Sequence, residues 1–514
     1  MKEMCFVQNE TADREVSAVL NVVPAMRALL TLGLGGVMAA LLPSDPAHAV
    51  PAFASQTGQP CVACHIGGFG PQLTPLGRAF KIGGYTQNGG EGWRSQIPLS
   101  AYWQGSFTSL NKDTPRGGND ATPAGNTTNR YAPNNNFNID QASIFVAGGF
   151  GDHTGIFSQW TAADDFSAFA MDNTDFRPYT NEYDIGDHEL RVGISLNNNP
   201  TVQDPYNSSF AWGYPFIQPS GSLQTQPAAD VILSGGFNQN SIGATVYLWY
   251  DKSLYLDAGL YVSQSNWLLT RLGNSYGVGA IQGTAPYVRG AYEWNWDEGS
   301  DTQQSAHIGA IFMNANVNPL DQGSLHDNPA TTGIYGRDHY TDATIDGGYQ
   351  FLGDGTHIGT VLANYTHEWQ SLTGSANQYN AANGTTYGSG YGLDKVQLTG
   401  SYWYRNTYGL TLSWMGIWGK RNPVLYNIPT NAGGSPIPMI GSANNSPNST
   451  NFIVEADWVP FGKQDSWAQP FVNLKVGLQY WAFTTFNGSS QNYDGAGRSA
   501  RDNNTIYLFA WQAF

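Results

Sequence analysis

The residues of this chain with the most specific chemistry are Cys61, Cys64 and His65, which form a C-x-x-C-H motif. This pattern is typical of the covalent attachment of a c-type haem. The two thiols add to the vinyl groups of the haem, and the adjacent imidazole becomes the proximal ligand of the iron. We therefore predict one covalently bound haem c on Cys61 and Cys64, with His65 as its iron ligand.

Two other interpretations of the cysteine pair are a disulfide and one half of a zinc site. A zinc site needs two further ligands near the pair, and the 514-residue chain has only one other cysteine, Cys5. Cys5 lies in a segment that we expect to be removed. Haem attachment is the interpretation that we favour.

The segment before the motif predicts export from the cytoplasm. After Met26-Arg27, an apolar run over 28–42 leads to Ala47-His48-Ala49, a small-x-small cleavage site. We interpret residues 1–49 as an upstream extension and a signal peptide, with the mature chain starting near Val50. The run of about 15 residues is shorter than the roughly 20 that a membrane-spanning helix needs. Haem is attached outside the cytoplasm, so the signal and the motif agree.

The composition of the remaining chain indicates a transmembrane β-barrel. Charged residues make up 12%, against about 25% in ordinary globular domains. The chain has 61 glycines, 28 tyrosines, 24 phenylalanines and 16 tryptophans. No later segment has 18 consecutive apolar residues, which excludes a helical span. Low charge with many aromatic residues fits a barrel with aromatic girdles and polar loops better than a soluble propeller, for which no repeat is visible.

Alternating segments support the barrel. Residues 189–196 alternate polar and apolar side chains, as do residues 395–402. The short turn Arg405-Asn406-Thr407 leads into a second strand over 408–418. Long Asn-, Gly-, Pro- and Ser-rich stretches occupy 111–137, 197–225, 315–340, 373–394 and 424–450. Short turns at one rim and long loops at the other are typical of outer-membrane barrels.

The chain ends in one strand's length, 505–514, with a terminal phenylalanine, Phe514. Such an end resembles the signal read by the outer-membrane assembly machinery. From the lengths we predict three parts: 1–49, which is cleaved, a monohaem cytochrome c domain over 50–92, and a barrel over 95–514. About 10 residues per strand, with turns and loops, give about 16 strands. A barrel of that size has a lumen wide enough for the small domain to form a plug.

Two strings carry a resemblance to a known family. One is Gln59-Pro60-Cys61-Val62-Ala63-Cys64-His65 with the following 73–81, and the other is 195–205, read as Ser-Leu-Asn-Asn-Asn-Pro-Thr-Val-Gln-Asp-Pro. Together they resemble the fused outer-membrane monohaem cytochrome–porins of iron-oxidising bacteria. The resemblance implies an outer-membrane protein that takes electrons from extracellular Fe(II). Its haem then passes them to a periplasmic cytochrome or blue copper protein, and no nucleic-acid partner is expected.

The predicted haem domain lacks an ordinary sixth iron ligand. A c-type cytochrome usually supplies a methionine or a histidine on that side. No methionine occurs between Met38 and Met171, and no histidine occurs between His65 and His153. Lys81 could serve only if it were deprotonated. The iron is therefore expected to have a weak sixth ligand unless the barrel wall supplies one.

The barrel wall offers two candidates, His307 and Met313. One face of this strand is apolar throughout, with Ala306, Ile308, Ala310 and Phe312. If that face meets lipid, His307 and Met313 point into the lumen. The interpretation that we favour is that both simply line the channel or pack there.

A different class of function is also compatible with these patterns. The haem domain could sense redox state or gate a porin, or the donor could be a reductant other than iron. A plugged conduit would pass little ionic current and a gated porin much more.

Overall fold

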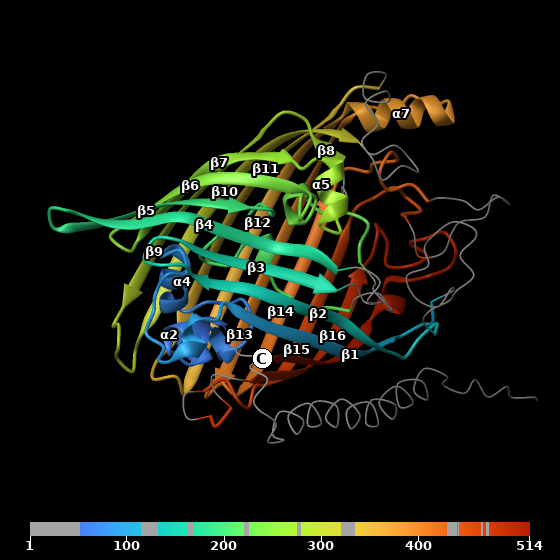
Figure 1. Ribbon diagram of the computed structural model, residues 1–514. Coiled ribbons are helices and arrows are strands. Elements are labelled where there is room, and N and C mark those ends of the chain that lie inside the picture. The colour runs from blue at the N-terminus through green and yellow to red at the C-terminus, as the bar shows by residue number, and fades with distance from the viewer. Residues whose placement is uncertain are drawn as a thin grey trace, which may run out of the picture.

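A computed structural model describes residues 52–114, 132–162, 169–219, 226–274, 279–319, 335–428, 439, 441–463, 466–468 and 472–514. The predicted signal peptide and upstream extension over 1–49 lie outside the described residues. The described chain is a closed antiparallel β-barrel with a few short helices (Figure 1), which confirms the predicted barrel. Within this part of the chain, no helix is long and apolar enough to cross a membrane.

Seventeen strands form the barrel wall. They are β1 (Leu99–Leu110), β2 (Asn136–Gly149), β3 (Gly155–Ala162), β4 (Phe169–Ile185), β5 (His188–Asn197), β6 (Ser241–Tyr250), β7 (Leu254–Ser263), β8 (Gly279–Ile281), β9 (Ala285–Trp296), β10 (Gln304–Pro319), β11 (Asp338–Phe351), β12 (His357–Leu372), β13 (Gly390–Tyr404), β14 (Tyr408–Gly419), β15 (Ser449–Trp458), β16 (Asn473–Thr485) and β17 (Thr505–Ala513).

The wall has sixteen strand positions, because the three-residue β8 and the longer β9 lie end to end and both pair with β10. The sheet closes where β1 pairs with β2 on one side and with β17 on the other. The β1–β17 ladder runs from Tyr102 opposite Ala513 to Leu110 opposite Thr505. The predicted count of about 16 strands is confirmed.

The two faces of the wall differ in polarity, because successive side chains of a strand point to opposite faces. On β10, Ile308 and Phe312 are 53% and 45% exposed, whereas His307 and Met313 are buried inside. Exposed apolar side chains continue around the barrel, with Val246, Leu260, Val288, Ile345, Val361, Leu398, Leu412, Phe452 and Leu478. A barrel with an apolar outside and a polar inside spans the outer membrane, so the predicted location is confirmed.

The two rims differ in the length of their connections. One rim carries short turns, such as 186–187, 251–253 and 405–407, and the other carries long connections, such as 111–135, 373–389 and 420–448. In outer-membrane barrels the short turns are periplasmic and the long loops extracellular. The predicted asymmetry is confirmed.

Some stretches predicted as loops are instead regular structure. β10 continues to Pro319, β11 already begins at Asp338, and the helix α7 (Thr373–Asn383) fills part of the 373–394 stretch. Beyond the lipid-facing zone both faces of a strand meet water or protein. The alternation of polar and apolar residues then disappears although the ladder continues.

An N-terminal helical segment, residues 52–96, lies in the lumen at the short-turn rim. It consists of α2 (Ala52–Thr57), α3 (Cys61–Cys64), η1 (Ile66–Gly68), α4 (Pro75–Ile82) and η2 (Trp93–Gln96). The Val62 amide donates to the Gly462 carbonyl at 3.2 Å, and the Gly67 amide donates to Asn406 Oδ1 at 2.9 Å. In Figure 1 these blue helices lie at the end of the barrel opposite α5 (Asn266–Arg271) and α7.

The loop between β5 and β6 folds into the barrel rather than remaining at the rim. We call residues 198–219 the inward loop; it contains η3 (Phe210–Trp212). Thr201, Gln203 and Asp204 of this loop are fully buried. The stretch predicted over 197–225 as one of the long rim loops is thus corrected in its described part, because its polar side chains pair with inward-facing charges of the wall. The remaining short helices are η4 (Ile232–Ser234) and η5 (Ala500–Asn503).

Candidate functional site

The C-x-x-C-H motif forms a single helical turn. Pro60 precedes α3 in an extended conformation, and the His65 amide closes the turn by donating to the Cys61 carbonyl at 2.9 Å. Residues three apart lie on the same side of a helix, so Cys61 and Cys64 face the same way. Neither cysteine is in a disulfide, and both are partly exposed and line the same cavity.

His65 leaves this turn in an extended conformation, in a bridge with Leu73. Its Nδ1 is buried without a hydrogen-bond partner, and its imidazole has a hydrogen bond with the backbone of Gly70. Burial lowers the pKa of His65, so the ring is neutral near pH 7. An iron-ligating histidine typically has one ring nitrogen on the metal and the other on a carbonyl or carboxylate. His65 has the arrangement that such a ligand requires.

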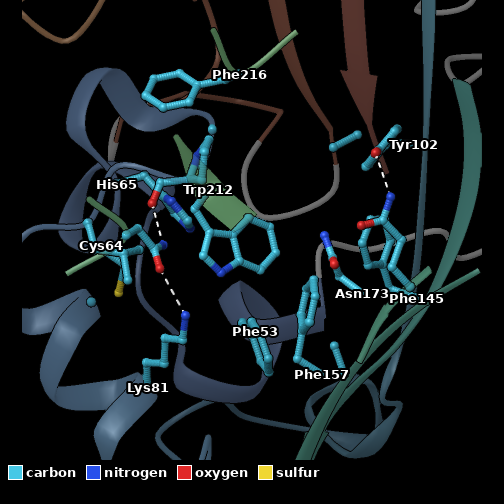
Figure 2. A pocket seen from close by; sticks show the side chains of 18 of the residues that line it. Phe53, Cys64, His65, Lys81, Tyr102, Phe145, Phe157, Asn173, Trp212 and Phe216 are labelled. Atoms are coloured by element: carbon cyan, nitrogen blue, oxygen red, sulfur yellow. Dashed lines mark hydrogen bonds between the residues drawn. The ribbon is translucent and has the colours of Figure 1, made fainter. Parts of the chain in front are cut away.

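The motif lies on one wall of a cavity of about 590 Å³ (Figure 2). The cavity is built by three parts of the chain: the N-terminal segment, the strands β1–β4 and β17, and the inward loop. Its aromatic lining consists of Phe53, Phe80, Tyr85, Tyr102, Phe145, Phe157, Phe210, Trp212, Phe216 and Trp511. Pockets for cofactor-sized ligands typically measure about 300–1,000 Å³ and are mainly apolar.

The residues present fit a haem c. Two cysteine side chains three residues apart that form no disulfide, a neutral imidazole with an unpartnered nitrogen and an aromatic wall all meet in one cavity. Burial and the neighbouring Cys61 raise the pKa of the Cys64 thiol to about 11, so this thiol is protonated at neutral pH. A thiol, and not a metal-bound thiolate, is the group that adds across a vinyl double bond.

Two glycines of the N-terminal segment permit close contact with the barrel wall. Gly67 and Gly84 have φ angles of 69° and 68°. A Cβ atom at Gly67 would lie 2.5 Å from the Trp403 indole, and one at Gly84 would lie 2.6 Å from the Thr180 methyl group. Glycine is required at such positions because other residues rarely adopt this backbone conformation and would clash.

A buried ion pair joins the N-terminal segment to the wall. Arg78 of α4 and Glu293 of β9 are 1% and 2% exposed, and Arg78 Nη2 lies 2.5 Å from Glu293 Oε1. The guanidinium also donates to the Leu73 carbonyl, to Gln350 Oε1 and to Ser305 Oγ at 2.9, 3.0 and 2.6 Å. Each nitrogen of the Arg78 guanidinium therefore donates to at least one acceptor.

Lys81, one turn further along α4, joins the N-terminal segment to the inward loop. Its Nζ donates to the carbonyls of Val202 and Asp204, both at 2.7 Å, and to Asn207 Oδ1 at 2.8 Å. Asn207 Nδ2 in turn donates to the Pro71 carbonyl at 2.6 Å. Burial lowers the pKa of Lys81 to about 7.

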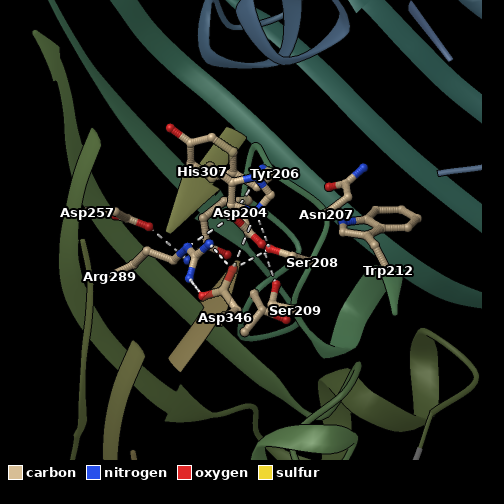
Figure 3. A network of polar contacts seen from close by, with 12 residues as sticks. Asp204, Tyr206, Asn207, Ser208, Ser209, Trp212, Asp257, Arg289, His307 and Asp346 are labelled. Carbon is tan, nitrogen blue, oxygen red and sulfur yellow. Dashed lines mark hydrogen bonds and ion pairs between the residues drawn. The ribbon is translucent and has the colours of Figure 1, made fainter. Parts of the chain in front are cut away.

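A second buried network fixes the inward loop to the barrel (Figure 3). Arg289 Nε donates to Asp204 Oδ1 at 3.0 Å, and its two terminal nitrogens donate to Asp346 at 2.5 and 2.9 Å. Ser208 donates to Asp346, and Ser209 donates to Asp204 Oδ2 at 2.6 Å. All three charged groups are fully buried and mutually paired.

The two candidate distal ligands from the sequence are not brought to the cavity of the motif. His307 stacks on Tyr206 with ring centroids 4.5 Å apart, and its Nε2 lies 3.3 Å from Ser208 Oγ. Met313 packs in a separate apolar cluster that includes Tyr261 and Tyr340. Both side chains point into the lumen and pack there, as the favoured interpretation expected.

The inward loop supplies site residues that sequence reasoning missed. Trp212 Nε1 donates to the Val202 carbonyl at 2.9 Å, and its indole packs edge-on against Phe157 at 5.6 Å. Figure 2 shows this indole projecting into the cavity beside His65. The apolar cluster Phe210-Ala211-Trp212 could have indicated that this loop is buried, because it interrupts an otherwise polar stretch and a loop exposed to water does not need it.

No protein-family model matches this chain, and no curated protein matches it in sequence. Among solved structures, it is similar to the outer-membrane channel DcaP of Acinetobacter baumannii, at 11% identity and a TM-score of 0.38, over 81% of this chain and 96% of that one. The in-vitro folded outer-membrane protein OmpT of Vibrio cholerae is 10% identical, over 81% and 97% of the two chains, with a TM-score of 0.36. Salmonella typhi OmpF, in complex with daunomycin, is 10% identical over 81% and 97%, with a TM-score of 0.37. Our assignment of the fold rests on the strand pairing of this chain and not on these similarities.

Proposed function

We propose that this protein is an outer-membrane electron conduit. It takes electrons from extracellular Fe(II), carries them on one haem c attached to Cys61 and Cys64, and delivers them to a periplasmic cytochrome or blue copper protein. In enzymatic terms it is an Fe(II)-oxidising oxidoreductase. The observation that carries the proposal is the C-x-x-C-H motif on the wall of an aromatic cavity inside the barrel.

The residues around the cavity define what the protein contributes. When bound, the haem supplies a centre that exchanges one electron, which matches the oxidation of Fe(II) to Fe(III). Cys61 and Cys64 would hold the cofactor through two thioether links where free haem would be lost. His65 would hold the iron, and the aromatic lining would exclude water from the cofactor. A dry surrounding strengthens the electrostatic control of its potential.

The position of the cavity suits transfer across the membrane. Electrons do not cross about 30 Å of hydrocarbon unaided. The motif contacts the short-turn rim through Gly462 and Asn406, while the inward loop starts from the long-loop rim and contacts the N-terminal segment at Lys81. A cofactor in this site would therefore split the electron's path between the two compartments into two shorter steps.

The choice of Fe(II) as donor rests on the family resemblance and on charge. A second cavity, of about 630 Å³, lies among the connections of the long-loop rim and is lined by Asp230, Asp338 and Glu368. Asp230 is paired with Lys395, whose Nζ lies 2.7 Å from its carboxylate, so Asp338 and Glu368 are the other acidic side chains among the described lining residues. Carboxylates attract hydrated divalent cations. The described residues contain no group of three or more His, Cys, Asp or Glu side chains able to hold a metal ion, so we assign Asp338 and Glu368 an attracting and not a chelating role.

A haem-gated porin is the second candidate. Gating would require the N-terminal segment or the inward loop to move, and both are held to the wall by buried charge pairs, Arg78–Glu293 and Arg289–Asp204. Breaking such a pair costs about 3–5 kcal/mol. The conduit is therefore the better supported function, and planar-bilayer recordings test it: low conductance in both redox states is expected, and a large redox-dependent current would favour the gated porin.

Haem attachment is tested first. Cys61→Ala and Cys64→Ala should each weaken covalent attachment, and the double variant should abolish it, as measured by haem staining after denaturing electrophoresis. His65→Ala should retain the stain but change the absorption spectrum. Trp267→Ala, an exposed substitution on α5, serves as the control that changes neither. Stain retained by the double cysteine variant would refute the assignment.

Electron transfer is tested in lipid vesicles that contain the purified, haem-loaded protein. Fe(II) added outside should reduce the haem and then an acceptor, such as cytochrome c, trapped inside. The double variant Cys61→Ala/Cys64→Ala should insert into the membrane as a barrel but should not transfer electrons. If Fe(II) reduces the haem at neither acid nor neutral pH, the donor is not iron.

A further inference from the structure

Among the residues that the structure describes, the cavity that holds the motif offers one strong iron ligand and no second one. Its described lining residues include a single histidine, His65, and no methionine. The sulfur atoms in this lining belong to Cys61 and Cys64, and both would be used in the thioether links. A six-coordinate c-type haem needs a second histidine, a methionine or another strong donor on its other side.

Lys81 lines the cavity but is not free to bind iron. Its Nζ is surrounded by three acceptors, the carbonyls of Val202 and Asp204 and Asn207 Oδ1, at 2.7–2.8 Å. To ligate iron, Lys81 would have to release the inward loop from α4. The contact is therefore structural.

The titratable oxygen-bearing side chains of the lining, Asp172, Tyr85 and Tyr102, are likewise engaged. Asp172 accepts hydrogen bonds from Thr161 and Gln239, both at 2.8 Å. The hydroxyl of Tyr85 donates to Asp175 at 2.7 Å, and that of Tyr102 donates to a glutamine of the wall. None of them is left as a spare donor toward the motif.

The other described histidines that could have reached the cavity have partners elsewhere. His153 contacts the Thr180 carbonyl at 2.9 Å, and His307 packs on Tyr206. Three more, on the outside of the wall, have partners 2.7 Å away: His188 on Asp251, His357 on Tyr402 and His367 on Asp394.

The group that does approach His65 is the indole of Trp212. It projects into the cavity beside the motif (Figure 2) and is fixed by its bond to the Val202 carbonyl, by Phe157 and by Lys81, whose Nζ lies 5.3 Å from the ring centroid. An indole nitrogen is a hydrogen-bond donor only, so Trp212 would cover a bound haem without ligating its iron.

We infer that, within the described residues, this chain supplies His65 as the only axial ligand and Trp212 as a cover, which leaves the sixth position open to small exogenous ligands such as carbon monoxide, cyanide or imidazole. The inference rests on the proposed haem attachment and extends it. The electron conduit would then also be a ligand-binding haem site, and a ligand in that position would slow electron transfer.

The spin state of the full-length, haem-loaded protein in detergent tests the inference directly. Absorption and magnetic circular dichroism should show high-spin ferric iron, saturable conversion to low spin with imidazole, and binding of carbon monoxide to the ferrous form. A low-spin protein that binds neither ligand would overturn the inference. Absence of covalent haem would instead refute the proposed function, so the two failures are distinguishable.

Variants separate a cover from a ligand. Trp212→Ala should speed carbon monoxide association several-fold with unchanged spin state and haem content, Trp212→Phe should restore the slow rate, and Trp267→Ala on the exposed surface should leave it unchanged. Lys81→Ala, His307→Ala and Met313→Leu should leave the spin state of the iron as it is. If any of these three converts low-spin to high-spin iron, that residue is the distal ligand and the inference is wrong.

Discussion

The buried pair Arg78–Glu293 should determine how firmly the N-terminal segment is held in the barrel. The two side chains are 1% and 2% exposed and 2.5 Å apart. Replacing Glu293 by glutamine removes the negative charge and leaves the Arg78 charge buried, with only neutral acceptors around it. Removing one partner of a buried pair costs about 3–5 kcal/mol, which corresponds to an opening equilibrium between about 100-fold and a few thousandfold more favourable.

Hydrogen exchange followed by mass spectrometry, on the full chain in detergent, measures this opening. The amides of α4, such as that of Arg78, which donates to the Thr74 carbonyl at 3.0 Å, should exchange faster by that factor in Glu293→Gln. The matched control is Glu189→Gln, which breaks an ion pair with Lys252 whose side chains are 44% and 61% exposed. Exposed pairs contribute about 1 kcal/mol or less.

A double variant, Arg78→Gln with Glu293→Gln, should recover part of the protection, because it leaves no unpaired ion in the interior. An increase of less than tenfold in Glu293→Gln, or an increase equal to that of the control, would refute the argument that this pair holds the segment. Exchange of the strand amides should be unaffected in all variants, which separates release of the segment from unfolding of the barrel.

Three further predictions concern the motif and the barrel. Burial raises the pKa of Cys64 from 9.0 to about 11, so its thiolate fraction at pH 8 falls about 100-fold. Alkylation of Cys64 in haem-free protein should therefore be slower by that factor than in the denatured chain, and its rate should rise with pH up to about 11. Equal rates in the folded and denatured chains would contradict the burial argument. Gly67→Ala should destabilise the N-terminal segment by about 1–3 kcal/mol more than Gly151→Ala. Both glycines have positive φ, but only a Cβ atom at Gly67 would clash with an indole, that of Trp403. Hydrogen exchange of the N-terminal segment in both variants measures the difference. Deleting Phe514 removes its two backbone hydrogen bonds with Ala101, at 2.8 and 2.9 Å, and should reduce the heat-modifiable, membrane-inserted fraction, whereas normal insertion would show that the end of β17 is dispensable for closure.

Much of the barrel could be predicted from the sequence because its signals are local. Alternation with a period of two follows from the pleat of a strand, so it placed Ile308 outside and His307 inside without knowledge of any partner strand. The C-x-x-C-H motif is likewise contained in five residues, and its thiol spacing follows from one helical turn. The turn at Arg405-Asn406-Thr407 was visible for the same reason.

The surroundings of the motif were decided only by the tertiary structure. Arg78 and Glu293 are 215 residues apart, and Lys81 and Val202 are 121 apart, so no local pattern marks either contact. The inward loop shares the Asn-, Pro- and Ser-rich composition of a rim loop, and its burial depends on Arg289 and Asp346 of other strands. The cavity exists because closure of the sheet brings β17 beside β1; the order of residues along one strand does not contain that distance.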